Sequence, residues 1–230
     1  MTETSLRDRL RTWQKKVREG GLDSIFYALT WRLPAWFFRY THAYLVLAND
    51  LDVVAPDTKA FRFRLADLSD AENFALLGVS AKTVRERLGA GDYCGVAVRE
   101  DGMVCSMVWA STGRLYLDGA GTTLDCEPEG VYVYNSFTLA ELRGHSLYRG
   151  CSAAVCDWFK REGRSVRYGI IDKLNEASFK ANGRINLKND GESRYFRFCG
   201  LHLSLLTNWP KTSRRLFISI GRRTRGARIV

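Results

Sequence analysis

The stretch that decides the fold runs from Val131 to Gly163 and reads VYVYNSFTLAELRGHSLYRGCSAAVCDWFKREG. Its first residues alternate between β-branched and aromatic side chains, which predicts a strand over 131–134. After a break at Arg143-Gly144, apolar residues recur at helical spacing: Leu147, Cys151, Ala154, Val155 and Trp158. A short Gly-containing turn from a strand into a helix leaves unpaired backbone N–H groups and the positive end of the helix dipole at one point, which attracts phosphate.

The turn itself has the sequence Arg143-Gly144-His145-Ser146-Leu147-Tyr148. It resembles the signature of the GNAT N-acyltransferases, in which a strand is followed by Arg or Gln, two residues, Gly, one residue, Gly or Ala, and a helix. Ser146 stands at the first Gly of that signature and Tyr148 at the second small residue. The string LAELRG is similar to the family's PEYRG, and Leu147-Tyr148 is similar to a variant in relatives associated with bacterial surface-polysaccharide synthesis.

A second segment extends the resemblance, which covers roughly residues 61–201. The strand expected over 166–172 is followed by Asn175-Glu176-Ala177-Ser178, which resembles the family's NEAS at the start of the next helix. In the family this helix continues to a Tyr that is often the general acid, and then to Gly-Phe. Asn182 stands at the Tyr position and Asn186-Leu187 at the Gly-Phe position, so the usual acid is missing.

The resemblance implies a fold of the α/β (α+β) class, a single GNAT-like domain whose central mixed, mainly antiparallel sheet is flanked by helices. The sequence pattern predicts strands over 61–65, 93–99, 104–111 and 114–118, helices from a Ser69/Glu72 capping box to Gly78 and over 80–88, and a loop over 119–130. We expect a basic, amphipathic helical extension over 1–56, the acyltransferase domain over 57–207 and a basic C-terminal segment over 208–230.

The expected extension contains two amphipathic stripes. One covers residues 5–19, and the other covers residues 22–37 and is interrupted by Pro34, which should end the helix near Leu33. A short strand is predicted over Ala43–Leu47, and His42 before it reads as a packed or surface histidine. Basic helices rich in Trp and Phe suit an anionic membrane surface, and packing on the domain or on a second subunit in a homodimer is the alternative.

The net charge of +10 is located at the two ends of the chain. Residues 51–210 hold 20 Lys or Arg against 20 Asp or Glu, whereas residues 211–230 hold seven Lys or Arg and no acidic residue. This distribution argues against nucleic-acid binding and for a surface that the ends contact. No apolar run is long enough for a membrane-spanning helix and no signal peptide is recognisable, so we expect a cytoplasmic protein, peripheral at the inner face of the membrane if its ends bind there.

The six cysteines and three histidines lack the spacing of metal ligands, so we expect no metal and mostly buried, reduced thiols. The resemblance implies acetyl-CoA or another acyl-CoA as the acyl donor. The residues expected to hold it are Phe137, Thr138, Leu139, Arg143, Gly144, His145, Ser146, Leu147, Tyr148, Asn175 and Ser178.

The expected reaction is attack of an amine on a thioester, which requires a base, a donor for the thioester oxygen and an acid for the leaving thiolate. Glu129, just before the strand, is the candidate base, and Tyr134 or its neighbour Tyr132 is the candidate acid in place of the missing Tyr. Tyr148 leaves coenzyme A room if it points away from the turn, and blocks or reshapes the site if it points inward.

Three functions remain open. The first is transfer of an acetyl or other acyl group from acyl-CoA to the amine of a small molecule, such as an amino sugar in surface-polysaccharide synthesis. The second is synthesis of an N-acyl amino acid with acyl carrier protein as donor, since the basic ends would attract that acidic partner. The third is a non-catalytic interaction module on the same scaffold.

Overall fold

The computed structural model describes residues 21–183, 185, 187–210, 216–220 and 228–229. Residues 21–32 are helical. The other elements are β1 (Phe38–Ala48), β2 (Phe61–Leu65), η1 (Leu68–Leu77), α2 (Ala81–Gly89), β3 (Tyr93–Arg99), β4 (Val104–Ser111), β5 (Arg114–Leu117), β6 (Thr122–Asp125), β7 (Gly130–Thr138), η2 (Ala140–Leu142), α3 (Leu147–Arg161), β8 (Val166–Asp172), α4 (Glu176–Gly183), β9 (Lys188–Phe198), β10 (Leu201–Thr207), β11 (Leu216–Ile220) and β12 (Arg228–Ile229).

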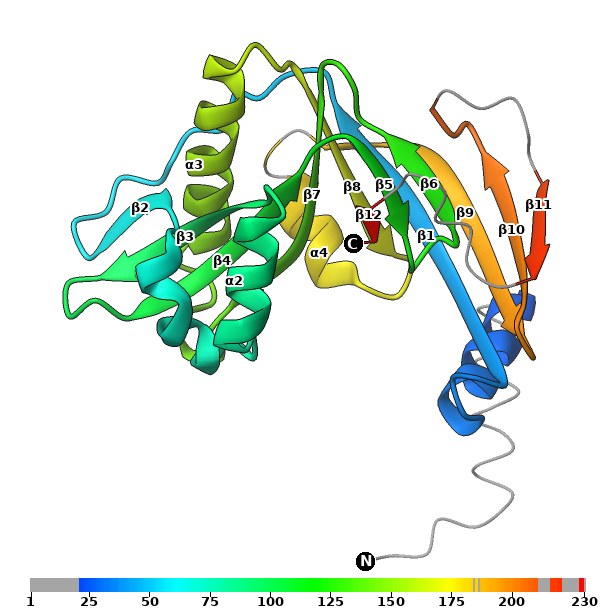
Figure 1. Cartoon of the computed structure of the whole chain (residues 1–230). Coiled ribbons are helices and arrows are strands. Elements are labelled where there is room, and N and C mark those ends of the chain that lie inside the picture. Colours follow the sequence, from blue (N-terminus) through cyan, green and yellow to red (C-terminus); the bar gives the residue numbers. More distant parts are fainter. Residues whose placement is uncertain (1–20, 184, 186, 211–215, 221–227, 230) are drawn as a thin grey trace, which may run out of the picture.

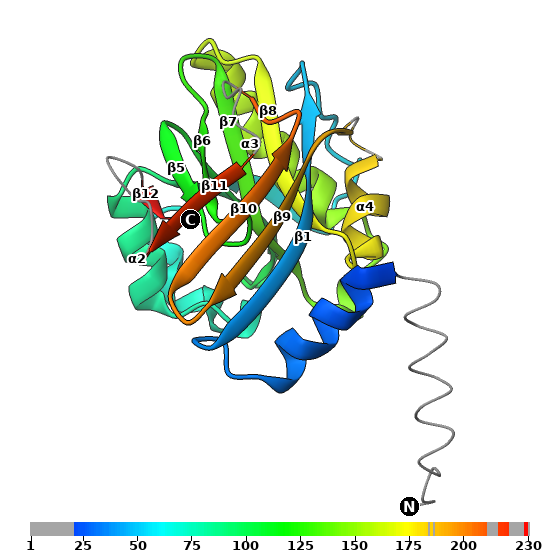
Figure 2. The same ribbon diagram turned by 90° about the vertical axis from the view of Figure 1, so that its right-hand side faces the viewer.

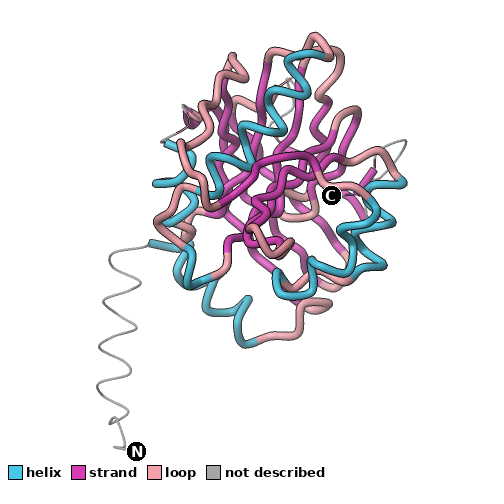
Figure 3. Tube along the Cα trace, turned by 90° about the vertical axis from the view of Figure 1, so that its left-hand side faces the viewer, coloured by secondary structure: helices cyan, strands magenta, loops and turns pink. Residues whose placement is uncertain are grey.

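A nine-stranded sheet with the order β11-β10-β9-β1-β8-β7-β4-β3-β2 organises the molecule (Figure 1). Within it, β7 and β8 are parallel and the other neighbouring pairs are antiparallel. The expected class, a mixed and mainly antiparallel sheet flanked by helices, is confirmed. Figure 3 shows helices packed on the outside of the strands.

The strand expected at Ala43–Leu47 is longer than expected and lies inside the sheet. As β1 it pairs with β8 on one side and with β9 on the other, so residues far apart in sequence are joined through it. The division at residue 57 is therefore wrong as a structural boundary, because it separates β1 from the sheet that contains it. The helix that precedes β1 ends at residue 32, where Pro34 was expected to stop it. The helix expected over 5–19 lies outside the described residues.

The two faces of the β3–β4 region are covered by different helices. A Cβ on Gly95 would lie 2.1 Å from the backbone oxygen of Cys151, so α3 packs directly on the backbone of β3. Gly95 is opposite Val108 in the ladder, and the adjacent Trp109 therefore faces the other way, where its ring contacts Phe74 of η1 at 6.0 Å. The sheet is thus buried between α3 on one face and η1 with α2 on the other.

Two local expectations were wrong. The cap of η1 is Asp67, whose side chain accepts a bond from the backbone N–H of Ser69 and forms a capping box with Asp70, two residues earlier than the expected Ser69/Glu72 pair. The stretch 119–130, expected to be a loop, contains β6, which pairs with β5 in a small second sheet. Both expectations rested on short sequence patterns, and packing against the rest of the chain determined the structure at both places.

The expected C-terminal segment, 208–230, also takes part in both sheets. Within it, β11 pairs with β10 at the edge of the large sheet, and β12 pairs in parallel with β5 of the small sheet. Figure 2 shows β11, β10, β9 and β1 side by side. The six cysteines are free thiols, and Cys199 is the exposed one. Among the described residues, no helix combines the length and the apolar composition needed to cross a bilayer.

Candidate functional site

The parallel strands β7 and β8 separate part of the way along their length. They pair from Gly130 with Val166 to Val133 with Gly169, and beyond this point β8 pairs with β1 while β7 continues beside β4. The space between the diverging strands is open at the end nearest α3 and α4. This divergence positions the candidate site.

A β-bulge lies on β7 at the same level. Trp109 of β4 is opposite Tyr134 and Met107 is opposite Phe137, so two residues of β7, Asn135 and Ser136, face the single Val108. Asn135 has a φ of 43°, in the left-handed region that Asn tolerates better than most residues. A bulge leaves its extra residue without a ladder partner, which frees backbone groups beside the divergence of the strands.

The turn from η2 into α3 has the geometry that the sequence pattern suggests. Gly144 has a φ of 91° and Ser146, the N-cap of α3, has a φ of 58°. The first helical hydrogen bond runs from the N–H of Gly150 to the oxygen of Ser146 at 3.2 Å. The N–H groups of the first turn, Leu147 to Arg149, precede that bond and have no partner within the helix.

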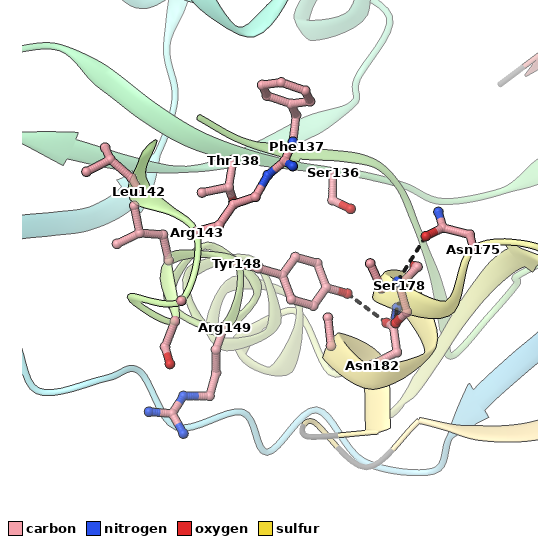
Figure 4. A pocket seen from close by; sticks show the side chains of 15 residues that line it. Ser136, Phe137, Thr138, Leu142, Arg143, Tyr148, Arg149, Asn175, Ser178 and Asn182 are labelled. Atoms are coloured by element: carbon pink, nitrogen blue, oxygen red, sulfur yellow. Dashed lines mark hydrogen bonds between the residues drawn. The ribbon is translucent and has the colours of Figure 1, made fainter. Parts of the chain in front are cut away.

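A cavity of about 470 Å³ lies between this turn, the end of β7 and α4. Its walls come from three parts of the chain, shown in Figure 4. The lining residues are Ser136, Phe137, Thr138, Leu142, Arg143, Gly144, Ser146, Leu147, Tyr148, Arg149, Asn175, Ala177, Ser178, Ala181 and Asn182. The two arginines give this end of the cavity a positive charge that adds to that of the helix terminus.

Tyr148 points inward from α3. Its hydroxyl donates a 2.7 Å hydrogen bond to Oδ1 of Asn182 on α4, whereas the guanidinium of Arg149 points away from this contact (Figure 4). The amide nitrogen of Asn182 in turn donates to the backbone oxygen and the hydroxyl of Ser178, at 2.8 and 3.1 Å. Burial raises the pKa of Tyr148 to about 12, so the hydroxyl remains protonated at neutral pH.

A second cavity, of about 60 Å³, continues from the first into the gap between β7 and β8. The two cavities share Ser136, Tyr148, Ser178 and Asn182, and the smaller one also touches apolar side chains of β1 and β8, including Val46 and Ile171. The contact between Tyr148 and Asn182 therefore lies between a larger outer space and a smaller inner one.

Most of the residues expected to hold the acyl donor line the large cavity. They are Phe137, Thr138, Arg143, Gly144, Ser146, Leu147, Tyr148, Asn175 and Ser178. Leu139 is buried in the core instead, and His145 is exposed outside the lining. The lining residues absent from the expected set are Ser136, Leu142, Arg149, Ala177, Ala181 and Asn182. The position of Arg149, in the first turn of α3, was a usable signal.

Glu129, the candidate base, lies outside the lining of both cavities. It is exposed at the start of β7, where its backbone oxygen accepts bonds from Ser165 and Val166. Seven residues of extended chain, roughly 23 Å, separate it from Ser136 at the cavity. The sequence placed it near the strand but did not reveal at which end the site would lie.

Tyr134 contributes to the wall of the small cavity, but its hydroxyl is engaged elsewhere. It donates a 2.7 Å bond to Asp92, and its ring lies 5.4 Å from the guanidinium of Arg87 on α2. Tyr132 stacks on it at 5.8 Å and is buried in the core. The expected role of Tyr134 as acid is therefore replaced by a packing role on the α2 side of the sheet.

The described lining residues of both cavities include no Asp, Glu or His. Throughout the described part of the chain, no three His, Cys, Asp or Glu side chains gather in a way that could hold a metal ion. The polar groups available at the site are hydroxyls, amides, two guanidinium groups and the backbone N–H groups of the turn and the bulge.

The sequence matches no protein-family model and no protein of curated function. Among solved structures, it is similar to a conserved protein of unknown function from Staphylococcus epidermidis, with a TM-score of 0.50 and 10% identity over 85% of this chain and 66% of that one. It is also similar to a protein from Novosphingobium aromaticivorans assigned to the GNAT acetyltransferases, with a TM-score of 0.49 and 16% identity over 66% of this chain and 61% of that one.

A third similar structure is an aminoglycoside N-acetyltransferase in complex with CoA, with a TM-score of 0.42 and 18% identity over 56% of this chain and 92% of that one. The chain spans less than two thirds of the Staphylococcus and Novosphingobium proteins. At these identities the likeness to the Staphylococcus protein indicates a shared fold alone, and the reaction has to be argued from the site.

Proposed function

We propose that this protein is an N-acyltransferase that moves an acyl group from acyl-CoA to the amine of a small molecule. The observation that supports this most directly is the position of the large cavity, at the N-terminus of α3 and beside the bulge where β7 and β8 diverge. The same place is where the resemblance to the GNAT family implies acyl-CoA binding.

The cavity lining suits the anionic end of the donor. The N–H groups at the start of α3 and the guanidinium groups of Arg143 and Arg149 are the groups that bind phosphate oxygens in proteins. Gly144 has no atom within 4 Å of the position a Cβ would take, so its backbone is open to a ligand. Tyr148 narrows the path between α3 and α4, but a cavity of about 470 Å³ remains beside it.

The bulge and Tyr148 are the groups placed to assist the chemistry. A thioester carbonyl near Ser136 would accept hydrogen bonds from backbone N–H groups freed by the bulge, which stabilises the negative charge that develops on oxygen. The hydroxyl of Tyr148 lies against Asn182, the position at which the family carries its Tyr. We assign this hydroxyl the role of hydrogen-bond donor to the leaving sulfur. To do so, it would release Asn182 and donate to the sulfur instead.

The bond changes are those of amide formation. The amine nitrogen forms a bond to the thioester carbon as the carbon–sulfur bond breaks, and the proton lost by nitrogen balances the one gained by sulfur. The described lining residues supply no carboxylate or imidazole to accept the proton of an ammonium group, so that proton passes to solvent. This assignment favours amines that are substantially unprotonated at the working pH.

The proposal extends to the identity of the acyl donor and of the acceptor. Acetyl-CoA is the donor to test first, because the inner cavity of about 60 Å³ has room for a short acyl group and little more. Acyl carrier protein presents the same pantetheine arm and is the alternative donor. An amino sugar is the acceptor to test first.

Calorimetric titration tests the donor site. Wild-type protein is titrated with acetyl-CoA and palmitoyl-CoA, alongside Arg143→Ala and the control Arg161→Ala. Arg143 precedes α3, and Arg161 is the last residue of α3 and lies outside the lining, so each variant loses one positive charge but only Arg143→Ala changes the cavity. We expect saturable binding that Arg143→Ala weakens by about tenfold and Arg161→Ala leaves within about twofold.

The outcomes separate the proposed functions. Binding with equal losses in both variants would place the donor elsewhere. Absence of binding to either thioester, followed by acyl transfer from acylated carrier protein to an amine panel, would make carrier protein the donor. The inward position of Tyr148 and the lack of acidic lining residues favour the non-catalytic module as the second candidate, and no transfer from any donor would support it.

A further inference from the structure

One face at the edge of the large sheet is apolar and open. Leu201, Leu203 and Leu205 of β10 are opposite Ile220, Ile218 and Leu216 of β11, so these side chains share one face. Leu201 is also opposite Phe198 of β9. We call the six exposed members of this set the apolar face: Phe198, Leu201, Leu205, Leu216, Ile218 and Ile220.

The exposure of this face is not shared by the reverse side of the same strands. Ile220 is 91% exposed and Ile218 54%, whereas His202, Ser204 and Leu206, which alternate with the leucines of β10, are buried. Figure 2 shows β10 and β11 turned toward the viewer. The helical segment 21–32 packs on β1 and β9 beside this face: the ring of Phe26 lies 5.2 Å from that of Tyr40 and 5.1 Å from that of Phe196.

Aromatic side chains continue the face beyond the sheet. Phe37 packs on Phe198 at 5.0 Å, and Trp36 packs on Phe37 at 5.8 Å. Trp36 is 70% exposed, and Trp31 in the helical segment is 82% exposed. An exposed tryptophan beside an aliphatic surface, as Trp36 is, is typical of contact with the interfacial region of a bilayer.

The stretch of sequence that contains β11 has charges of one sign. The strand β11 lies within residues 211–230, which contain seven Lys or Arg and no Asp or Glu. Arg194 on β9, beside the face, is paired with Glu192 at 2.9 Å. An apolar surface whose strand β11 belongs to a basic stretch of sequence is complementary to an anionic lipid surface, which combines negative head groups with an apolar interior.

We propose that the apolar face docks onto an anionic lipid surface. A second copy of the chain on the same face would bring two copies of this basic stretch of sequence together, which repulsion between like charges opposes. Residues 1–20 hold six Lys or Arg against three Asp or Glu, so their net charge has the same sign as that of the stretch that contains β11. The face lies at the opposite end of the sheet from β2–β4, and the lining of the donor cavity contains none of its residues.

Vesicle co-sedimentation of the full chain tests this proposal. The vesicles are pure phosphatidylcholine, or equal parts phosphatidylcholine and phosphatidylglycerol. The test variant is Ile218→Asp with Ile220→Asp, and the control is Val54→Asp with Leu76→Asp. Val54 and Leu76 are 80% and 64% exposed and lie outside the apolar face, so both double variants add the same charge at exposed apolar sites.

We expect wild type to bind phosphatidylglycerol vesicles in preference to pure phosphatidylcholine and less tightly at high salt. The Ile218/Ile220 variant should bind about tenfold or more weakly, and the control within about twofold of wild type. If the double variant folds poorly, the single variant Ile220→Asp, at the end of β11, is used in its place. It should lose less vesicle binding than the double variant. Calorimetric binding of acyl-CoA should be unchanged in all variants, which separates this test from that of the proposed function.

Three results would overturn the proposal: no binding of wild type to anionic vesicles, equal binding by the two double variants, or a dimer in sedimentation that Ile218→Asp with Ile220→Asp converts to monomer. The last result would identify a second copy as the occupant of the face.

Discussion

The hydroxyl of Tyr148 and the side-chain oxygen of Asn182 lie 2.7 Å apart and join α3 to α4 across the candidate site. Helix α3 supplies a tyrosine where the signature that it resembles has a small residue, and α4 supplies an asparagine where that family has a tyrosine. The two departures meet in one hydrogen bond. A phenol supplied by α3 therefore lies against α4.

Replacing Tyr148 with Phe should separate its chemical role from its packing role. The ring remains, so we expect the free energy of unfolding to fall by about 1 kcal/mol, as for one lost hydrogen bond. If the proposed function is right, kcat should fall about tenfold or more with a smaller change in KM for acyl-CoA. Urea titration and steady-state assays measure these effects.

The control for that variant is Tyr93→Phe. The Tyr93 ring packs on Phe159 at 5.0 Å, and its hydroxyl makes no hydrogen bond within the described residues. Tyr93→Phe should lower the free energy of unfolding by less than Tyr148→Phe does, and kcat should be unchanged. A kcat of Tyr148→Phe equal to wild type would remove Tyr148 from the chemistry while leaving the donor site intact.

The free energy of unfolding should fall at alkaline pH because the buried Tyr148 resists ionisation in the folded protein. Burial raises its pKa from the ordinary value of 10.0 to about 12, so the unfolded chain loses this proton first as pH rises. The free energy of unfolding should therefore be unaffected by this proton below pH 10. It should fall by up to about 2–3 kcal/mol between pH 10 and 12. Urea titrations at several pH values should show a shallower decline for Tyr148→Phe, and equal slopes would contradict the assignment.

The position of α3 should depend on Gly95. A Cβ there would meet the backbone oxygen of Cys151 at 2.1 Å and a methyl of Val155 at 2.9 Å, and backbone atoms cannot move aside cheaply. Gly95→Ala should therefore destabilise the protein by about 1–3 kcal/mol or more and weaken acyl-CoA binding by displacing α3.

Gly89→Ala is the matched control, because nothing lies within 4 Å of the added Cβ at the end of α2. We expect it to be neutral or stabilising by up to about 1 kcal/mol. Thermal unfolding followed by circular dichroism compares the two variants. A Gly95→Ala protein as stable as Gly89→Ala would show that α3 is not packed as closely as the structure indicates.

Asp23 should contribute to stability through an ionic network at the start of β1. Its carboxylate lies 2.7 Å from Nδ1 of the buried His42 and 2.7 Å from Nζ of Lys173. Burial opposes the charge, but hydrogen bonds from Lys173, Tyr40 and His42 outweigh it and hold the pKa of Asp23 well below its usual 3.8. Asp23→Asn should cost about 1.5–3 kcal/mol near neutral pH.

The pH dependence of that loss has a defined sign. Because the folded pKa is depressed, the contribution of Asp23 is present above about pH 4 and is lost as pH falls below it, so wild type and Asp23→Asn should converge in stability in acid. Asp52→Asn, which removes the partner of Lys160 at an exposed pair, is the control and should cost less than about 1 kcal/mol. Losses of equal size would contradict a special role for the network.

Local signals in the sequence were sufficient for much of the fold. The strand, turn and helix from Val131 to Gly163 were expected in the right order, since alternation and helical spacing depend on neighbouring residues. Nine of the residues expected to hold the donor line one cavity because they come from two continuous segments, 137–148 and 175–178. Chain continuity alone brings members of one segment together.

Residues with distant partners were assigned less well. The sequence offered no partner for His42, yet its ring lies between Asp23 and Glu192, each at 2.7 Å. Glu129 was expected at the site because it directly precedes the strand, but the two ends of a strand lie far apart. The engagement of Tyr134 with Asp92 depends on a neighbour 42 residues away.

The sequence by itself determined the class of the fold, through its resemblance to a known family, and it determined the turn at Gly144 and the helix that follows, because backbone preferences and apolar periodicity act over a few residues. Only the tertiary structure decided that β1 enters the sheet between β8 and β9, that Tyr148 points inward to Asn182, and that β10 and β11 expose an apolar face. Each of these depends on pairing or packing between segments distant in the chain, and the free energy of such contacts exists only once the whole fold has formed.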